Sequence, residues 1–169
     1  MNLTQPSSSL PIRSHSRLLA PTAFKFVLNR ELRRAMRSST RLSLVVIETT
    51  RSLDGVTVTA DERTIREVAQ LINDEMRDHD LFGFADEGTL SLVLRGTDYS
   101  RSVRVVDRLL SRLETHQFAM PIQIALGAAC YPMHAMGAES LKRWALSHPI
   151  ACCRGCIDPP DMNAINAKN

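Results

Sequence analysis

The stretch Leu81-Phe-Gly-Phe-Ala-Asp-Glu-Gly-Thr-Leu-Ser-Leu-Val-Leu-Arg-Gly-Thr-Asp98 decides the fold class. Apolar runs at 81–84 and 89–94 flank the polar segment 85–88, which is typical of a β-hairpin with a short turn. Gly96 then closes the second strand, and Thr97 or Asp98 is placed to cap a following helix. Because strand and helix signals alternate within a few residues, this region predicts an α/β domain.

The chain before this hairpin also alternates between helix-like and strand-like segments. From Thr22, apolar residues recur at helical spacing with basic residues opposite them, which predicts an amphipathic helix. The apolar run 42–48 is typical of a central strand covered on both faces, and Asp54-Gly55 marks a turn after it. The segment 59–62 (Thr-Ala-Asp-Glu) has the form of a capping box for a second helix, which we expect to end between residues 77 and 80.

The chain after the hairpin continues the alternation. We expect a helix from about 98 that buries one set of apolar residues and exposes one set of basic residues. The buried set is Val103, Val106, Leu110 and Leu113, and the exposed set is Arg101, Arg104, Arg108 and Arg112. A buried strand over 122–130 and a short helix over 139–147 follow, with Trp144 expected in the core or an interface. The whole order predicts an α/β sandwich with one central mixed sheet of about five strands, flanked by helices on both faces.

Length and composition set the domain organisation. A chain of 169 residues with 44% hydrophobic content is the size of one compact domain. Residues 1–20 are rich in Ser, Pro and Arg without periodicity, so we expect a flexible tail or connector there. The domain is expected over 21–155, and a C-terminal tail over 156–169.

The charge pattern and hydropathy exclude several classes of partner. The 21 basic residues are interspersed with 18 acidic ones, which is too weak a bias to predict nucleic-acid binding. No run of about 18 apolar residues exists, and the first residues lack the apolar segment of a signal peptide. We therefore expect a cytoplasmic protein without nucleic acid as a partner and without membrane contact from this segment.

Four cysteines raise the question of a metal or disulfide site. Cys152 and Cys153 are adjacent and point in different directions on any regular element, no C-x2-C pair exists, and Cys130 lies in an apolar run. Together with Cys156 they are predicted to be reduced, structural thiols, with a zinc site as the alternative. We expect no cofactor and no bound metal.

Several segments, in this order and spacing, resemble the GGDEF (diguanylate cyclase) family. They are Leu32-Arg-Arg-Ala, Leu42-Ser-Leu-Val-Val-Ile, Val68-Ala69, Leu92-Val-Leu-Arg-Gly-Thr-Asp98 and Ala125-Leu-Gly-Ala-Ala-Cys-Tyr-Pro132. The likeness covers about residues 23–155. It implies a sandwich of the GGDEF or nucleotide-cyclase type.

The residues that carry catalysis in that family are replaced here. In active members, carboxylates at the end of the first strand and in the hairpin turn hold Mg²⁺ against the triphosphate. At these places this chain has Glu48-Thr-Thr50 and Asp86-Glu-Gly-Thr-Leu90, so that Thr89 stands at the acidic signature position. Asp86 and Glu87 replace two glycines and would repel phosphate. The resemblance therefore implies a degenerate domain that is not an enzyme, with a rearranged metal site at Glu48, Asp86 and Glu87 as the less favoured alternative.

One family motif is retained in spelling and position. Arg77-Asp-His-Asp80 matches the RxxD inhibitory motif, which binds cyclic di-GMP in the family. An arginine fork can bind phosphate or a guanine edge, and a carboxylate can accept from guanine N1 and N2. Arg104 and Arg108 align with the helix that supplies an auxiliary arginine. The candidate ligand site is thus Arg77, Asp80, Arg104 and Arg108, although Arg and Asp at a helix end can also be purely structural.

Two functions are consistent with these observations. The first is a catalytically silent receptor that binds cyclic di-GMP through Arg77 and Asp80 and passes a signal to a protein partner. The second is a protein-interaction or dimerisation module without a nucleotide ligand.

Overall fold

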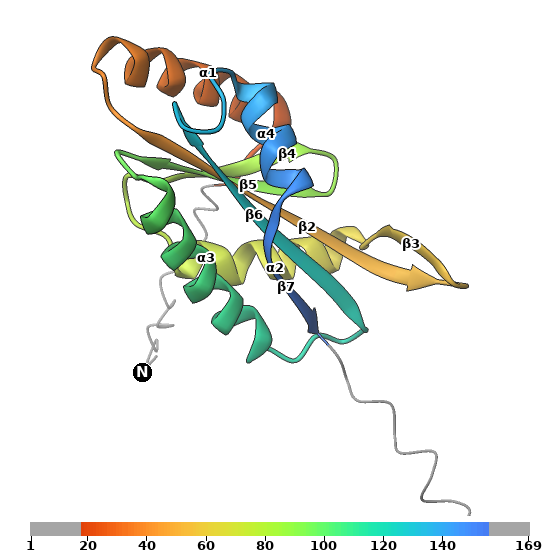
Figure 1. Ribbon diagram of the computed structural model, residues 1–169. Coiled ribbons are helices and arrows are strands. Elements are labelled where there is room, and N and C mark those ends of the chain that lie inside the picture. Colours follow the sequence, from red (N-terminus) through yellow and green to blue (C-terminus); the bar gives the residue numbers. More distant parts are fainter. Residues whose placement is uncertain (1–17, 156–169) are drawn as a thin grey trace, which may run out of the picture.

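The computed structural model describes residues 18–155, and the elements of this part of the chain form one mixed sheet with helices on both faces (Figure 1). The strands are β1 (Leu18–Leu19), β2 (Leu42–Leu53), β3 (Val56–Thr59), β4 (Leu81–Asp86), β5 (Thr89–Arg95), β6 (Ile122–Tyr131) and β7 (Pro149–Gly155). The helices are α1 (Pro21–Arg37), α2 (Glu62–Asp74), α3 (Tyr99–Glu114) and α4 (Ala138–Ser147). The strand order is β1-β4-β5-β2-β6-β7, with β3 paired to β2. The predicted fold class is confirmed.

Strand β2 lies at the centre of the sheet because it is apolar on both faces. It pairs antiparallel with β5 on one side and β6 on the other, and residues 42–47 are all buried. Leu44 and Val46 face a core cluster with α1 and α4, whereas Val45 and Ile47 face a cluster with α2 and α3. Figure 1 shows this division, with α1 and α4 on one side of the sheet and α2 and α3 on the other.

The predicted hairpin at 81–94 is confirmed as β4 and β5. These strands pair antiparallel, and Glu87 and Gly88 lie between them. Gly88 has a φ of 77°, a left-handed conformation that glycine adopts without steric cost. The Asp54-Gly55 turn is also present, and it joins β2 to the short strand β3.

The sheet has seven strands, against about five predicted from the sequence. The sequence located four strands by residue range, at 42–48, 81–84, 89–94 and 122–130, and the strands that it did not locate are β1, β3 and β7. β1 is only two residues long and pairs parallel with β4, so Leu18 and Leu19, which precede the expected start of the domain at residue 21, belong to the sheet. β1 and β3 are too short to show a periodicity of their own. β7 is seven residues long, and its pairing with β6 defines it, as the pairing with β4 and β2 defines β1 and β3. Residues 1–17 and 156–169, where tails are expected, lie outside the described residues.

The second helix differs from its prediction at both ends. Its N-cap is Asp61, whose side chain accepts a hydrogen bond from Thr64 N at 2.9 Å, so the capping box that starts at Thr59 is wrong. Thr59 is instead the last residue of β3 and pairs with Thr50. The helix ends at Asp74, several residues before the predicted end, and 75–80 form the connection to β4.

The third helix, α3, has the predicted N-cap, but not every residue that was predicted to be buried on it is buried. Asp98 is the N-cap and accepts from Arg101 N at 2.9 Å. Val106 and Leu113 are buried as predicted, but Val103 and Leu110 are only partly covered, and Leu109 is buried in place of Leu110. The buried face is therefore rotated by about one residue from the predicted one.

The cysteines and Trp144 also have defined environments. Cys130 and Cys153 are buried and Cys152 is exposed, all with free thiols, while Cys156 lies outside the described residues. Trp144 is 37% exposed and stacks on His148 with ring centroids 4.1 Å apart, so it is not a core residue. None of the described helices has the length and apolar character of a membrane span.

Candidate functional site

A cavity lined by five arginines lies where the end of β5 meets the α2–β4 connection and α3. Its volume is about 480 Å³, and a smaller neighbouring cavity of about 280 Å³ shares Arg95 and Gly96 with it. The lining of the larger one is Arg77, Arg95, Gly96, Thr97, Arg101, Arg104, Val105 and Arg108. The structure thus brings together three of the four predicted site residues: Arg77, Arg104 and Arg108.

Each arginine reaches the cavity for a local reason. Arg77 lies in the connection after α2, which leaves helical geometry before it. Arg95 is the last residue of β5. Arg101, Arg104 and Arg108 follow one another at spacings of three and four residues, which places them on one face of α3. The Asp98 cap fixes where that helix begins and therefore where this face points.

Three of the five arginines have acidic partners. Arg108 donates to the Glu75 carbonyl oxygen at 2.8 Å, and its Nε lies 3.5 Å from Glu75 Oε2. Arg101 Nε lies 3.9 Å from Asp98 Oδ2. Arg95 Nε lies 3.0 Å from Oε2 of Glu31, a carboxylate whose side chain is only 4% exposed. These contacts hold the three guanidinium groups at the wall of the cavity.

The other two arginines are unpaired. Within the described part of the chain, the side chains of Arg77 and Arg104 have neither a hydrogen-bond acceptor nor an acidic partner. Both are exposed, so water solvates them. A concave surface with two unpaired guanidinium groups and three paired ones is chemically suited to an anion, above all to phosphate oxygens.

Asp80, the remaining predicted site residue, does not line this cavity. Its side chain is 9% exposed, and the imidazole Nε2 of His79 lies 3.9 Å from its Oδ1. Of the two residues that define the RxxD motif, Arg77 therefore lines the cavity and Asp80 does not.

Sequence reasoning did not assign Arg95 or Arg101 to the site. Arg101 belongs to the predicted basic face of α3, so its periodicity with Arg104 and Arg108 is a signal that was available. Arg95 has no such signal, because its contact with Glu31 joins residues 64 positions apart. Only the folded chain brings these two side chains together.

In the region that aligns with the catalytic signature, the side chains of the β4–β5 turn contact other residues of the chain. Glu48 is exposed and pairs in register with Thr89, the residue at the acidic signature position. Asp86 accepts a hydrogen bond from Lys142 Nζ at 2.9 Å, and Lys142 also lies 3.0 Å from Glu139 Oε2. The Asp86 and Glu139 carboxylates raise the pKa of Lys142, with Asp86 the larger cause. The space beside Gly88 is filled by the Thr59 side chain.

The described residues contain no group of side chains suited to bind a metal ion. Across 18–155, no three His, Cys, Asp or Glu side chains lie together as candidate metal ligands. Asp86 and Glu139 face the ammonium group of Lys142 instead.

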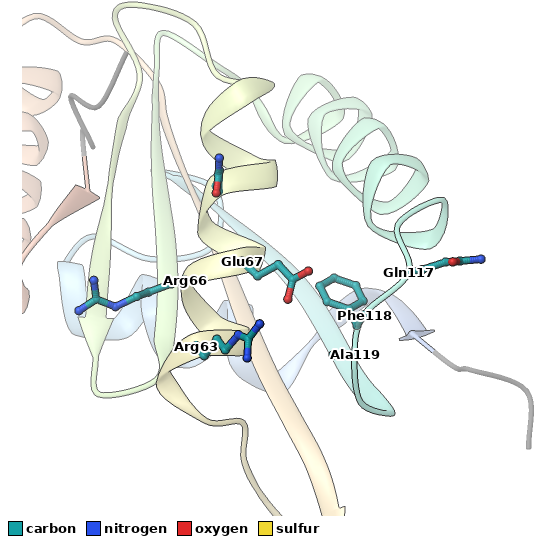
Figure 2. A pocket seen from close by; sticks show the side chains of 7 residues that line it. Arg63, Arg66, Glu67, Gln117, Phe118 and Ala119 are labelled. Atoms are coloured by element: carbon teal, nitrogen blue, oxygen red, sulfur yellow. The ribbon is translucent and has the colours of Figure 1, made fainter. Parts of the chain in front are cut away.

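A second and larger groove lies between α2 and the segment after α3 (Figure 2). Its volume is about 580 Å³, and its lining is Arg63, Arg66, Glu67, Gln70, Gln117, Phe118 and Ala119. Most of its charges are paired: Glu67 Oε1 lies 2.7 Å from His116 Nε2, and Arg66 pairs with Glu62 at 2.6 Å. Figure 2 shows Glu67 directed toward Phe118, whose ring is buried in the core. This groove lacks the excess of one charge that distinguishes the arginine-lined cavity.

Several solved structures that are similar to this chain are GGDEF domains. The GGDEF domain of YfiN (TpbB) from Pseudomonas aeruginosa has a TM-score of 0.64 at 20% identity, covering 78% of this chain and 88% of that chain. A DGC protein from Thermotoga maritima has a TM-score of 0.65 at 16% identity, covering 78% and 95%. The GGDEF domain of DgcB from Caulobacter crescentus, solved in complex with c-di-GMP, has a TM-score of 0.62 at 16% identity, covering 84% and 90%. No protein-family model matches the chain, and no curated protein matches its sequence.

Proposed function

We propose that this chain, which has the fold of a GGDEF domain, is a catalytically inactive signalling domain that binds cyclic di-GMP in its arginine-lined cavity. One observation carries the proposal: Arg77 and Arg104 face a cavity with three further arginines and have no partner in the described residues. Five like charges of which only three have an acidic partner repel one another, and an anionic ligand would reduce that repulsion.

The chemistry of cyclic di-GMP fits this cavity. The ligand carries two phosphodiester groups, and an arginine fork can donate two parallel hydrogen bonds to each. The position of Arg77 and of the α3 arginines also matches the family motif from which the ligand was predicted. The complex of the DgcB domain with c-di-GMP supports the choice of this ligand as the first to test.

The proposal of inactivity rests on charge at the signature region. Thr89 has no charge with which to hold Mg²⁺, and Glu87 is an exposed carboxylate where phosphates would approach. Asp86, the other acidic residue of the turn, is already paired with Lys142. Thr59 further blocks the backbone at Gly88. A site of this kind supplies neither two metal-holding carboxylates nor an open turn for a triphosphate.

Isothermal titration calorimetry with cyclic di-GMP tests the binding proposal. The full chain is expected to bind with a micromolar or lower Kd, and GTP is expected to give no saturable signal. Arg112→Ala provides a matched control, because Arg112 is an exposed arginine on the same helix and does not line the cavity. Absence of binding by the wild-type chain would contradict the proposal.

A second candidate is a protein-interaction module, and one surface favours it. Phe26 is 69% exposed on α1, and Arg30, Arg33 and Arg37 lie on the same outer side of that helix at spacings of four, seven and eleven residues. A large exposed aromatic side chain among cations is typical of a contact surface. Failure of cyclic di-GMP to bind would make this surface the better account of function.

A further inference from the structure

We infer that the arginine-lined cavity recognises the phosphate groups of its ligand and not the guanine base, so that it accepts cyclic dinucleotides of different base composition. This inference rests on the proposed function, because it concerns the same cavity. It differs in what it predicts: the proposed function requires that cyclic di-GMP binds, whereas the inference requires that an adenine analogue binds almost as well.

The charges that line the cavity are all of one sign. Its five ionisable side chains are arginines, and no Asp or Glu is among its lining residues. The Watson–Crick edge of guanine presents N–H donors at N1 and N2, which need an acceptor. Guanidinium groups only donate. The side chains that surround the ligand therefore suit phosphate oxygens and leave the distinguishing edge of guanine without a charged partner.

Three carboxylates near the cavity, those of Asp80, Glu75 and Asp98, do not supply that acceptor. Asp80 is almost fully covered and lies beside His79, outside the lining. Glu75 and Asp98 pair with Arg108 and Arg101, respectively, and they too lie outside the lining. Each of these carboxylates therefore holds a cation or is covered, and none faces the space that a base would occupy.

The neutral lining residues offer little more. The Thr97 hydroxyl donates to the Arg95 carbonyl oxygen at 3.2 Å, and the Thr97 carbonyl accepts from the Ser43 hydroxyl at 2.9 Å. Val105 is apolar, and Gly96 has no side chain. A base in this cavity would contact arginine planes and an aliphatic side chain, and such stacking contacts are tolerant of base identity.

One arginine geometry would still favour guanine. A fork directed at O6 and N7 pairs with guanine, whereas adenine has a donor in place of O6. Two phosphates and five arginines make the phosphate arrangement the more favourable one, because charge-assisted bonds to an anion are stronger than bonds to a neutral base. The test separates the two arrangements.

The experiment is calorimetry of the full chain with cyclic di-GMP, cyclic di-AMP and the mononucleotide GMP, at low and at moderate salt. We expect Kd values for the two cyclic dinucleotides within about fivefold of each other, and at least about tenfold weaker binding of GMP, which cannot bridge the arginines as two linked phosphates do. Both cyclic dinucleotides should lose affinity in parallel as salt is raised, because the contacts are ionic.

Two variants sharpen the result. Asp80→Asn keeps the size of the side chain and should leave both affinities and their ratio unchanged, with thermal unfolding checked to confirm the fold. Arg104→Ala should weaken both ligands by a similar factor. Cyclic di-GMP binding more than about fivefold tighter than cyclic di-AMP, or a loss confined to cyclic di-GMP in Asp80→Asn, would overturn the inference and leave the proposed function standing. Failure of all three ligands would overturn both.

Discussion

Arg95 Nε lies 3.0 Å from Glu31 Oε2, and this ion pair joins the end of β5 to the buried side of α1. Arg30 and Arg34 approach the same carboxylate at 3.5 and 4.0 Å. The Arg95 Nε makes no hydrogen bond in spite of its distance, so the contact is electrostatic. One nearly buried carboxylate thus attracts three guanidinium groups, although it offsets the charge of only one, and it holds Arg95 at the cavity.

The Glu31 carboxylate should contribute to stability. We expect Glu31→Gln to lower the free energy of unfolding by about 1 to 2 kcal/mol, less than for a fully buried pair because its arginine partners are in part solvated. Urea denaturation measures this. Glu62→Gln is the control, since Glu62 is 79% exposed in its pair with Arg66 and should change stability by less than about 0.5 kcal/mol. Equal effects of the two substitutions would count against the role given to Glu31.

Cys153 should be the less reactive of two adjacent thiols. Burial, with a smaller effect of Glu114, raises the pKa of Cys153 to about 11, so the thiol stays protonated at pH 8. Cys152 is exposed. Alkylation of the native protein with iodoacetamide at pH 8, mapped by tandem mass spectrometry, should label Cys152 and spare Cys153. Labelling of both at the same rate in the native state, with labelling of unfolded protein as the reference, would refute this.

The Glu139–Lys142 contact should make stability depend on acid pH. Lys142, and after it Lys25, hold the pKa of Glu139 below its ordinary value. A lowered pKa in the folded state means that the contribution is fully present above the ordinary carboxyl pKa and is lost as pH falls through the lowered value. The decrease in urea midpoint from pH 6 to pH 3 should therefore be smaller in Glu139→Gln than in wild type. Glu87→Gln, in the exposed hairpin turn, should keep the wild-type decrease.

The chain should not make cyclic di-GMP. Incubation with GTP and either Mg²⁺ or Mn²⁺, followed by nucleotide chromatography, should show no product, because Thr89 has no carboxylate with which to hold the metal and Asp86 is paired with Lys142. A product that forms with wild type and disappears in Glu48→Ala would show that an alternative metal site exists and would overturn the proposed inactivity.

Local patterns in the sequence were sufficient for the central part of the fold. The apolar run that starts at Leu42 and the alternation around Gly88 each favour one structure strongly, and β2 and the β4–β5 hairpin follow them. Strand β7 gives no comparable signal, since it begins with Pro149 and acquires its identity by pairing with β6 at the sheet edge. The cap of α2 shifted to Asp61 because Thr59 pairs with Thr50 in β3, a tertiary contact that overrides a local motif.

The candidate site was predictable only in part for the same reason. Arg77, Arg104 and Arg108 carry a motif and a helical period, and the structure places all three at one cavity. Arg95 joins them through a contact with Glu31 that no local pattern encodes. Asp80 lies outside the cavity because of the path that the chain takes between α2 and β4, and a four-residue motif does not determine that path.

The most direct test of the central claim is the Kd of cyclic di-GMP for wild type, Arg77→Ala, Arg104→Ala and Arg112→Ala under one set of conditions. Removal of either cavity arginine deletes charge-assisted hydrogen bonds of about 1.5 to 3 kcal/mol, which is roughly a tenfold to hundredfold rise in Kd. Arg112→Ala should bind as wild type does, and thermal unfolding should be nearly unchanged in all three because these side chains are exposed. Wild-type affinity in an Arg77→Ala, Arg104→Ala double variant, or equal losses in Arg112→Ala, would contradict the assignment of ligand binding to this cavity.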